Sequence, residues 1–382
     1  MPKPGQAMDA ERASCIQVLS AWEEIIALLG ETPLVSCNWR LTRACSARCG
    51  YCYSSSAQPL PNELDEGECL RVVDELAALG LVRLFISGGE PTLSKHLCRV
   101  VDRAASAGIK VGISTHGGHL SDRLIKSLRD AGLRQLQVSL DADGELHDEI
   151  RGVPGLWARA LNSISLAAKE FPLDRDLIVA TVVSRRNEGR ILSLAEMVLA
   201  AGARSFVLVP LTVTGRASQD LQVPIERLIA LSQMLERHFF GQSLRVSSLL
   251  PPAIATSGLG DRLSKAYLRP FPFEFAIDAD GNCALADLDL NNCGHLLGNV
   301  RSRSLKEIYA AAVESELPFL LTDRNQVDGV CRVCAFWDVC GGGNRPLSRL
   351  QTGRKDASDV LCQGAFDAGV FPRDSIVGVG ML

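Results

Sequence analysis

The chain has 382 residues, enough for two domains, and its 47% apolar and 22% charged residues are ordinary proportions for a globular protein. The net charge is 40 − 44 = −4 and the basic residues form no stripe, so we expect no nucleic-acid partner. No apolar run reaches the roughly 18 residues that span a bilayer, and residues 1–10 lack a signal-peptide pattern, so we expect a cytoplasmic protein without a membrane partner.

The first two thirds of the chain alternate between short apolar runs and amphipathic stretches. After a helix expected at 9–30, within an N-terminal extension of residues 1–33, the pattern predicts a strand followed by a helix six times. The strands are expected at 34–41, 82–87, 110–114, 135–140, 177–183 and 205–209, and the helices at 65–79, 94–107, 121–131, 156–170, 189–201 and 225–240. Such repeats build a parallel sheet with helices outside, so residues 34–243 are predicted to form an α/β partial (β/α)6 barrel with functional residues after the strands' carboxyl ends.

The pattern changes in residues 244–382. An Asp-Gly turn at 280–281 joins two short apolar runs into a predicted hairpin, and a helix is expected at 304–316. The part from Cys331 onward is loop-rich and cysteine-rich. Because such a segment buries little apolar surface, metal ligation would supply stability that its core lacks, and we expect a small separate C-terminal domain.

Three of the 13 cysteines fall within eight residues after the first predicted strand. These barrel cysteines are Cys45, Cys49 and Cys52. In a reducing compartment clustered cysteines indicate a metal site or catalysis, and three thiolates can hold a [4Fe–4S] cluster whose fourth iron stays open. Structural zinc normally takes four ligands, and a redox Cys-x-x-Cys leaves Cys45 unexplained, so both alternatives fit less well.

The C-x3-C-x2-C spacing, with Tyr51 directly before the third cysteine, resembles the signature of the radical S-adenosylmethionine (SAM) superfamily. The resemblance covers about residues 34–215. It implies that SAM binds the open iron and that an electron, from a donor such as flavodoxin or ferredoxin, cleaves SAM. The resulting 5′-deoxyadenosyl radical would then remove a hydrogen atom from a substrate.

Further matches follow in the order that this resemblance implies. Gly88, Gly89 and Glu90 resemble the segment that binds the amino group of SAM, since glycine permits close backbone approach and a carboxylate pairs with an ammonium. The other matches are Ser114, Thr115, Ser139, Asp141, Arg151 and Val183. Their hydroxyl and carboxylate groups suit the ribose, the arginine suits the methionine carboxylate and the valine suits the adenine. Each alone is as well explained by a turn, a strand end or a solvated charge; His116, where the family often has asparagine, receives no role.

A second set, the tail cysteines, consists of Cys331, Cys334, Cys340 and Cys362. By spacing alone four thiolates close either a zinc site or a [4Fe–4S] site, and zinc is the more common outcome. The C-x2-C-x5-C pattern with a late cysteine resembles the SPASM domain that follows many radical SAM barrels. That resemblance implies an auxiliary [4Fe–4S] cluster on these four residues.

The tail departs from the full SPASM pattern, which binds two auxiliary clusters and has a further cysteine after position 340. Here residues 341–343 are glycines and Asn344 follows. Only Cys283 and Cys293 remain for a second auxiliary cluster, and two thiolates make a poor cubane site. We therefore expect one auxiliary cluster, with Cys283 and Cys293 either in the core or, for one of them, acting as a hydrogen-atom donor.

The SPASM resemblance also bears on the substrate. Most relatives of this kind crosslink ribosomally made peptides or oxidise their side chains, which is the leading prediction for this chain. Since residues 1–33 look too short for a fused peptide-recognition domain, a separate protein would present the peptide. The alternatives are a small-molecule enzyme that alters tetrapyrrole propionates or aminosugars, epimerisation included, and a non-catalytic metal-binding scaffold.

Overall fold

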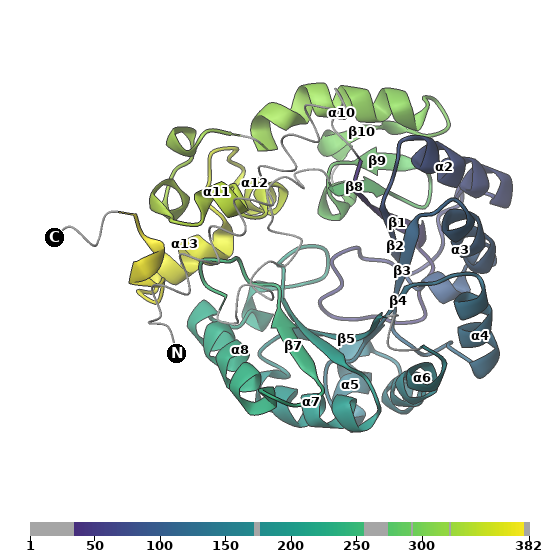
Figure 1. The fold of residues 1–382 in the computed structure, drawn as a ribbon, viewed down its shortest axis with the longest axis horizontal. Helices are drawn as coiled ribbons and strands as arrows, with labels where there is room; N and C mark the ends of the chain where they lie inside the picture. The colour runs from purple at the N-terminus through teal and green to yellow at the C-terminus, as the bar shows by residue number, and fades with distance from the viewer. Residues whose placement is uncertain (1–33, 172–175, 256–273, 292, 321, 378–382) are drawn as a thin grey trace.

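The computed structural model describes residues 34–171, 176–255, 274–291, 293–320 and 322–377. The helix expected at 9–30 lies outside these ranges. The described residues are built around one ten-stranded sheet with the strand order β10-β9-β8-β1-β2-β3-β4-β5-β6-β7. Figure 1 shows this sheet curving around the middle of the molecule, with helices along its outer side.

The elements alternate along the chain as the apolar pattern predicts. The strands are β1 (Ser36–Thr42), β2 (Arg83–Gly88), β3 (Lys110–Thr115), β4 (Gln135–Ser139), β5 (Asp176–Val183), β6 (Ser205–Pro210), β7 (Arg245–Ser248), β8 (Glu274–Ile277), β9 (Asn282–Ala284) and β10 (Leu296–Asn299). The helices are α2 (Glu66–Ala78), α3 (Leu97–Ser106), α4 (Asp122–Asp130), α5 (Gly144–Arg151), α6 (Leu156–Glu170), α7 (Ile191–Ala200), α8 (Ile225–Phe239), α10 (Leu305–Leu320), α11 (Trp337–Cys340), α12 (Arg345–Thr352) and α13 (Val360–Asp367).

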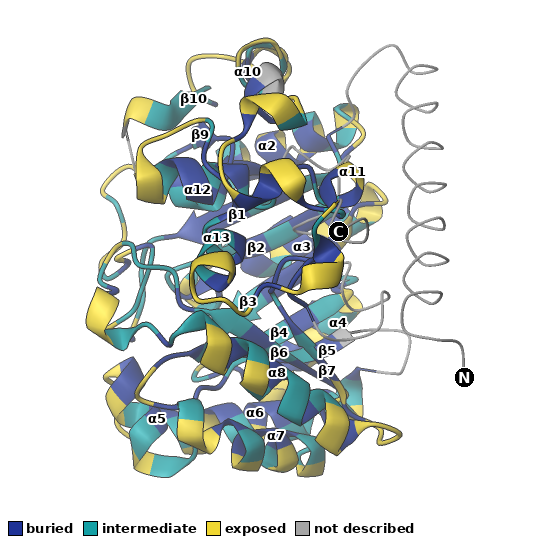
Figure 2. Cartoon of the chain, turned by 90° about the vertical axis from the view of Figure 1, so that its left-hand side faces the viewer, coloured by how far each residue is buried: buried dark blue, intermediate teal, exposed yellow. Residues whose placement is uncertain are grey.

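The predicted partial barrel is confirmed. Strands β1 to β6 pair in parallel in chain order, and each of the six expected strands and helices lies within three residues of its predicted bounds. Side chains alternate between the two faces of a strand. On β2, Leu84 and Ile86 are buried on the helix side, whereas Phe85 and Ser87 point into the barrel. Figure 2 shows buried and intermediate residues on the strands and exposed ones on the outer faces of the helices.

Two elements of the barrel were not predicted. Helix α5 is only eight residues long and strand β7 only four, so each carries too few apolar positions to show a period. Strand β7 lies beyond residue 243 and still continues the sheet by pairing in parallel with β6. Among the described residues, no helix has the length and apolarity required to cross a bilayer.

The C-terminal part joins the same sheet on its other edge. Strand β8 pairs in parallel with β1, with Ser36 opposite Glu274, and β8, β9 and β10 form antiparallel pairs. The short 3-10 helix η5 (Asp287–Asn291) follows β9. The pairing of β8 with β1 therefore brings residues after position 280 beside residues that follow β1, more than 200 positions earlier.

The two glycines that end β2 lie very close to the chain that leaves β1. A Cβ atom on Gly88, whose φ is +131°, would lie 2.3 Å from the Thr42 carbonyl oxygen, and one on Gly89 would lie 2.2 Å from the Ala44 carbonyl oxygen. Because both obstacles are main-chain atoms, only glycine fits. The amides of Gly89 and Glu90 donate to the same carbonyls of Thr42 and Ala44, at 2.8 and 2.7 Å. The ends of β1 and β2 are thereby held together.

Replacing Gly89 with alanine is expected to lower the free energy of unfolding by about 1–3 kcal/mol, the usual cost of overpacking a site that cannot relax. Urea unfolding followed by circular dichroism measures it. The matched control is Gly189→Ala, since a Cβ at Gly189 meets no atom within 4 Å. Equal free energies of unfolding for the two variants would show that the main chain at the β1–β2 contact can move aside for a methyl group at little cost.

Candidate active site

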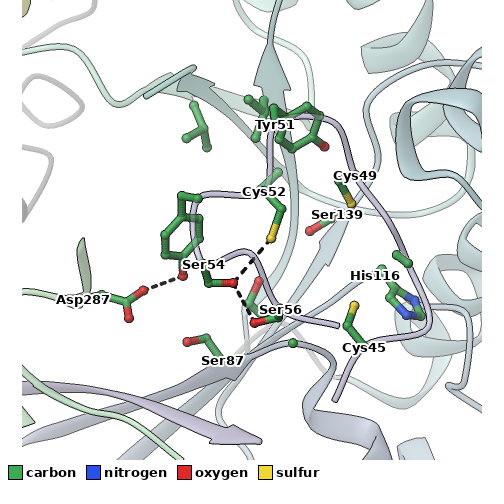
Figure 3. Close-up of a pocket in the computed structure, with 18 of the residues that line it drawn as sticks. Cys45, Cys49, Tyr51, Cys52, Ser54, Ser56, Ser87, His116, Ser139 and Asp287 are labelled. Atoms are coloured by element: carbon green, nitrogen blue, oxygen red, sulfur yellow. Dashed lines mark hydrogen bonds between the residues drawn. The ribbon is translucent and has the colours of Figure 1, made fainter. Parts of the chain in front are cut away.

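A cavity of about 390 Å³ lies at the carboxyl ends of the barrel strands. Its lining includes all three barrel cysteines together with Ser87, Ser114 and Ser139 from β2, β3 and β4. Figure 3 shows the three cysteines with Ser87 and Ser139 around one space. The volume lies within the range of small-molecule sites, and the position is the one where barrels of this kind carry their functional groups.

The loop that carries the barrel cysteines, residues 45–57, is called the cluster loop. The amide of Cys45 donates to the carbonyl of Ala57 at 3.0 Å and closes the loop at its base. The amide of Arg48 donates to the carbonyl of Arg151 at 2.8 Å, which ties the loop to the end of α5. The short helix that the sequence pattern missed thus supports the cysteines.

The three thiols of the cluster loop differ in how readily they ionise. Burial raises the pKa of Cys45 to about 11 and also raises that of Cys49. Burial opposes ionisation of Cys52 too, but a hydrogen bond with Ser54 and the charge of Arg216 outweigh it, so the pKa of Cys52 is lowered. Charge on Cys49 and Cys52 further raises the pKa of Cys45, so the three thiolates repel one another and need a cationic partner.

The donors around the cavity suit an iron–sulfur cluster and a polar ligand. Within the described ranges, no three Cys, His, Asp or Glu side chains are arranged to hold a single metal ion. The thiolates of a cubane cluster each bind a different iron and need not converge on one point. The buried hydroxyl of Ser87 lines the cavity and has no hydrogen-bond partner among the described residues, as expected of a group that meets a ligand.

The carboxylate of Glu90 is fully buried and is not part of the cavity lining. It accepts hydrogen bonds from the hydroxyl and amide of Thr92, from the hydroxyl of Thr115 at 2.6 Å and from the amide of His116 at 2.8 Å. All of these donors belong to the protein itself, so the carboxylate is already hydrogen-bonded. It links the end of β2 to the end of β3. Gly88 and Gly89 line the cavity and offer it only main-chain atoms.

Asp141 is also fully buried behind the cavity, at the end of β4. It accepts hydrogen bonds from the hydroxyl of Tyr51, from Nε of Arg151 at 2.6 Å and from the amide of Val182 at 3.0 Å. Burial favours the neutral acid, but the charges of Arg151 and His147 and the hydrogen bonds from Tyr51 and Arg151 together outweigh it, so the pKa of Asp141 is lowered. Arg151 and Tyr51 themselves line the cavity, so Asp141 orients two lining residues.

Most of the predicted SAM-binding residues line the cavity, and three of them lie behind its wall. The barrel cysteines and the predicted residues that line the cavity are Cys45, Cys49, Cys52, Tyr51, Gly88, Gly89, Ser114, Thr115, Ser139 and Arg151. Glu90, Asp141 and Val183 do not line it. Val183 is fully buried in the core between strand and helix, and Val182 lines the cavity instead, because neighbouring residues of β5 point to opposite faces.

Tyr53, Arg216 and Asp287 also line the cavity, and no part in binding SAM was predicted for them from the sequence. Asp287 lies in η5 and accepts hydrogen bonds from the hydroxyl of Tyr53 and from the fully buried guanidinium of Arg40. No local pattern marks these residues, since Tyr53 and Asp287 are 234 positions apart. Only the pairing of β8 with β1 brings them together.

The tail cysteines also come together, outside the barrel. Cys331, Cys334 and Cys362 are buried, and burial raises the pKa of all four thiols. Cys334 and Cys362 share a small core cluster against which Cys340 packs, and the Asp359 side chain, next to Cys331, accepts from the amide of Cys362, so the four residues are neighbours. The amide of Asp359 points at the sulfur of Cys331 and that of Phe336 at the sulfur of Cys334, each at 3.4 Å. Amide donors of this kind stabilise cluster thiolates.

Cys283 lies apart from both cysteine sets. It is on β9, has no exposed surface and packs in the main core, and burial raises its pKa well above the ordinary range. This position fits the expected alternative of an ordinary core residue. The side chain of Cys293 is not among those that the structure describes.

Comparisons with known proteins agree with this site. Residues 39–198 match the model of the Radical SAM superfamily. The chain is 30% identical over 358 residues to the mycofactocin maturase MftC of Mycobacterium ulcerans, covering 88% of this chain and 90% of the relative. It is 28% identical over 327 residues to an AdoMet-dependent heme synthase of Methanosarcina barkeri, covering 80% and 89%. The fold resembles Streptococcus suis SuiB bound to its precursor peptide SuiA, with a TM-score of 0.68, 16% identity and coverage of 87% and 76%.

The chain belongs to the radical SAM superfamily, and it is an enzyme of that family rather than a non-catalytic scaffold. Its cofactors therefore include SAM and a [4Fe–4S] cluster. Its relatives and its C-terminal extension place it in the SPASM/twitch-type subfamily.

Proposed function

We propose that the barrel cysteines hold the SAM-cleaving cluster and that the cavity beside them holds SAM. The main support is that these cysteines line one cavity with predicted residues from the ends of three strands, β2, β3 and β4. When bound, the cluster supplies the electron that releases a 5′-deoxyadenosyl radical from SAM. The protein's part is to bind and orient SAM and to exclude water from the radical.

Each predicted SAM-binding residue has a specific part in this proposal. Main-chain atoms of Gly88 and Gly89 meet the amino group, the hydroxyls of Ser114 and Ser139 meet the ribose, and Val182 offers apolar surface to the adenine. Arg151 offers its charge to the methionine carboxylate. Tyr51 and Thr115 complete the lining, whereas Glu90 and Asp141 act from behind it by fixing Thr115, Tyr51 and Arg151.

We further propose that residues 34–243 serve SAM cleavage and that residues 244–382 carry one auxiliary [4Fe–4S] cluster on the tail cysteines. Four neighbouring thiols, with amide donors at two of their sulfurs, support ligation by this set, and the resemblance of their spacing to the SPASM domain favours a [4Fe–4S] cluster over zinc. A cluster there would accept the electron that the substrate radical releases when it is oxidised.

Anaerobically reconstituted protein is expected to hold about eight irons and eight sulfides, the sum of two [4Fe–4S] clusters. Iron and sulfide assays measure this content. About twelve irons would show that a third cluster forms despite the missing cysteine after position 340. Stoichiometric zinc in fully active protein purified without air would refute the auxiliary cluster.

The proposed substrate is a ribosomally made peptide that is crosslinked or oxidised. Two relatives named for maturation, the mycofactocin maturase MftC of Mycobacterium ulcerans and the sporulation killing factor maturation protein SkfB of Bacillus subtilis, support this class. A second cavity, of about 410 Å³, shares Val209–Thr212 and Leu288 with the first and runs toward α12 and α13. None of the described residues that line it is charged, and Gln222, Asn344 and Gln351 supply amide groups. Such a lining suits an uncharged peptide segment better than the carboxylates of a tetrapyrrole.

One carboxylate is available to handle protons in the catalytic cavity. Asp287 is the only Asp or Glu among the described residues of its lining. Oxidative crosslinking removes a proton and an electron from the substrate radical, and Asp287 can accept that proton. Its hydrogen bonds from Tyr53 and Arg40 hold the carboxylate in place.

The test is incubation with SAM, dithionite and a short peptide encoded beside this chain's gene, with an iron coproporphyrin as the competing substrate. We expect the peptide's mass to fall by two hydrogens per modification, with one 5′-deoxyadenosine formed each time. Stimulation by the porphyrin and not by the peptide, with loss of carbon dioxide, would favour the heme-synthase alternative that the Methanosarcina barkeri relative suggests. In cells, a flavodoxin or ferredoxin would supply the electron and a separate protein would present the peptide.

A further inference from the structure

The loop after β6 is hydrogen-bonded to the cluster loop through Arg216. Its amide donates to the carbonyl of Cys52 at 2.9 Å, its Nε donates to the carbonyl of Cys49 at 2.9 Å, and its Nη1 donates to the carbonyl of Ser56 at 3.2 Å. One residue therefore binds three carbonyls of the cluster loop, two of which belong to barrel cysteines.

The preceding residue makes this contact possible. Gly215 has a φ of +61°, and a Cβ atom there would lie 2.4 Å from the carbonyl oxygens of both Cys52 and Tyr53. A side chain at this position would collide with the main chain of the cluster loop. Gly215 and Arg216 together are called the clasp. They contact carbonyl groups of the cluster loop, whereas α5 accepts from the loop amides of Arg48 and Gly50.

The two arginines that line the cavity, Arg151 and Arg216, differ in how their charges are paired. Arg151 is paired with Asp141 at 2.6 Å. Arg216 lines the same cavity, and its guanidinium donates to main-chain carbonyls, which leave its full positive charge beside the barrel cysteines. A carboxylate partner for it is not found among the described residues.

We propose that the clasp both holds the barrel cysteines in position and, through the Arg216 charge, raises the reduction potential of the SAM-cleaving cluster. This inference rests on the proposed ligation by the barrel cysteines. Reduction adds one electron, taken from dithionite or a carrier protein, to a site that three thiolates already make negative. A nearby cation lowers the free energy of that added charge. Arg216 is thus a positioning residue that also tunes the electron transfer.

The experiment separates charge from position. Three variants, Arg216→Gln, Arg216→Lys and Gly215→Ala, are compared with the matched control Arg185→Gln, an exposed arginine that also donates to a main-chain carbonyl, that of Gln222. Iron and sulfide content report cluster binding. A redox titration monitored by electron paramagnetic resonance reports the potential, using the signal that changes when SAM is added and so belongs to the barrel cluster.

For Arg216→Gln we expect about a tenfold lower ratio of reduced to oxidised barrel cluster at the wild-type midpoint, a drop of about 59 mV for one electron. Arg216→Lys, which keeps the charge, should restore most of this ratio. Gly215→Ala should lose cluster content, while the clusters that remain keep the wild-type potential. Wild-type potential in Arg216→Gln would overturn the tuning role, and full cluster content in Gly215→Ala would overturn the positioning role.

A second pair of variants tests the charge if Arg216→Gln binds no cluster. Thr212 lines the same cavity four residues before Arg216, so Thr212→Glu adds a carboxylate to the cavity that offsets the Arg216 charge, and Thr212→Gln is its neutral control. The Glu variant should have the lower potential of the two, and equal potentials would overturn the tuning role. Failure of the wild-type protein to bind iron or cleave SAM would instead refute the proposed function.

Discussion

Replacing all three barrel cysteines with alanine is expected to reduce SAM cleavage to the background rate. Cys45, Cys49 and Cys52 line the cavity and are the proposed ligands of the SAM-cleaving cluster. The proposed tail cluster lies outside the barrel, so without the barrel cluster SAM has neither an iron to bind nor an adjacent electron donor, and the loss should be complete. The measurement is 5′-deoxyadenosine formed from SAM and dithionite without air.

The matched control for this triple variant is Cys98→Ala. Cys98 lies on α3, is partly buried and does not line the cavity, so cleavage should continue in that variant. Circular dichroism shows whether both proteins are folded. If the triple variant still forms 5′-deoxyadenosine, the barrel cysteines do not hold the cluster.

Replacing Cys334 with alanine is expected to stop formation of modified peptide while SAM cleavage without product continues. The barrel cluster would remain intact, but the substrate radical could no longer pass its electron to the tail. Product mass and 5′-deoxyadenosine are measured in the same reaction, and their ratio reports the uncoupling.

The Cys334 variant needs a folding control, because Cys334 packs in a small core with Leu250, Phe336 and Ala365. Iron content should fall by about four, leaving one barrel cluster, with circular dichroism unchanged. A folded variant of this kind that made product at the normal rate would rule out electron acceptance by the tail.

In that event a redox-neutral epimerisation would explain the reaction better, and it needs a hydrogen-atom donor to quench the substrate radical. Cys283 is enclosed in the main core, so Cys293 becomes the residue to test. Turnover in deuterated water would decide the point, since an exchangeable thiol leaves deuterium in the product.

Much of the barrel is predictable from the sequence because the signals are local. Alternating faces along a strand and the helical period depend on residues a few positions apart, so six strands and six helices were placed within three residues. The spacing of Cys45, Cys49 and Cys52 is local as well, and it identifies the cluster loop. Elements with few apolar residues, such as α5 and β7, have no such period and were missed.

The sequence by itself therefore determined the class of barrel, the two cysteine sets and the order of the strand-end motifs. Only the tertiary structure decided which side chains reach the cavity: Val182 in place of Val183, and the clasp and Asp287 beside the cluster loop. It also showed that the Glu90 carboxylate is occupied by donors of the protein itself. The physical reason is that these contacts join segments up to 234 positions apart, and their distances arise from how β8 pairs with β1 and how β2 packs on the chain leaving β1.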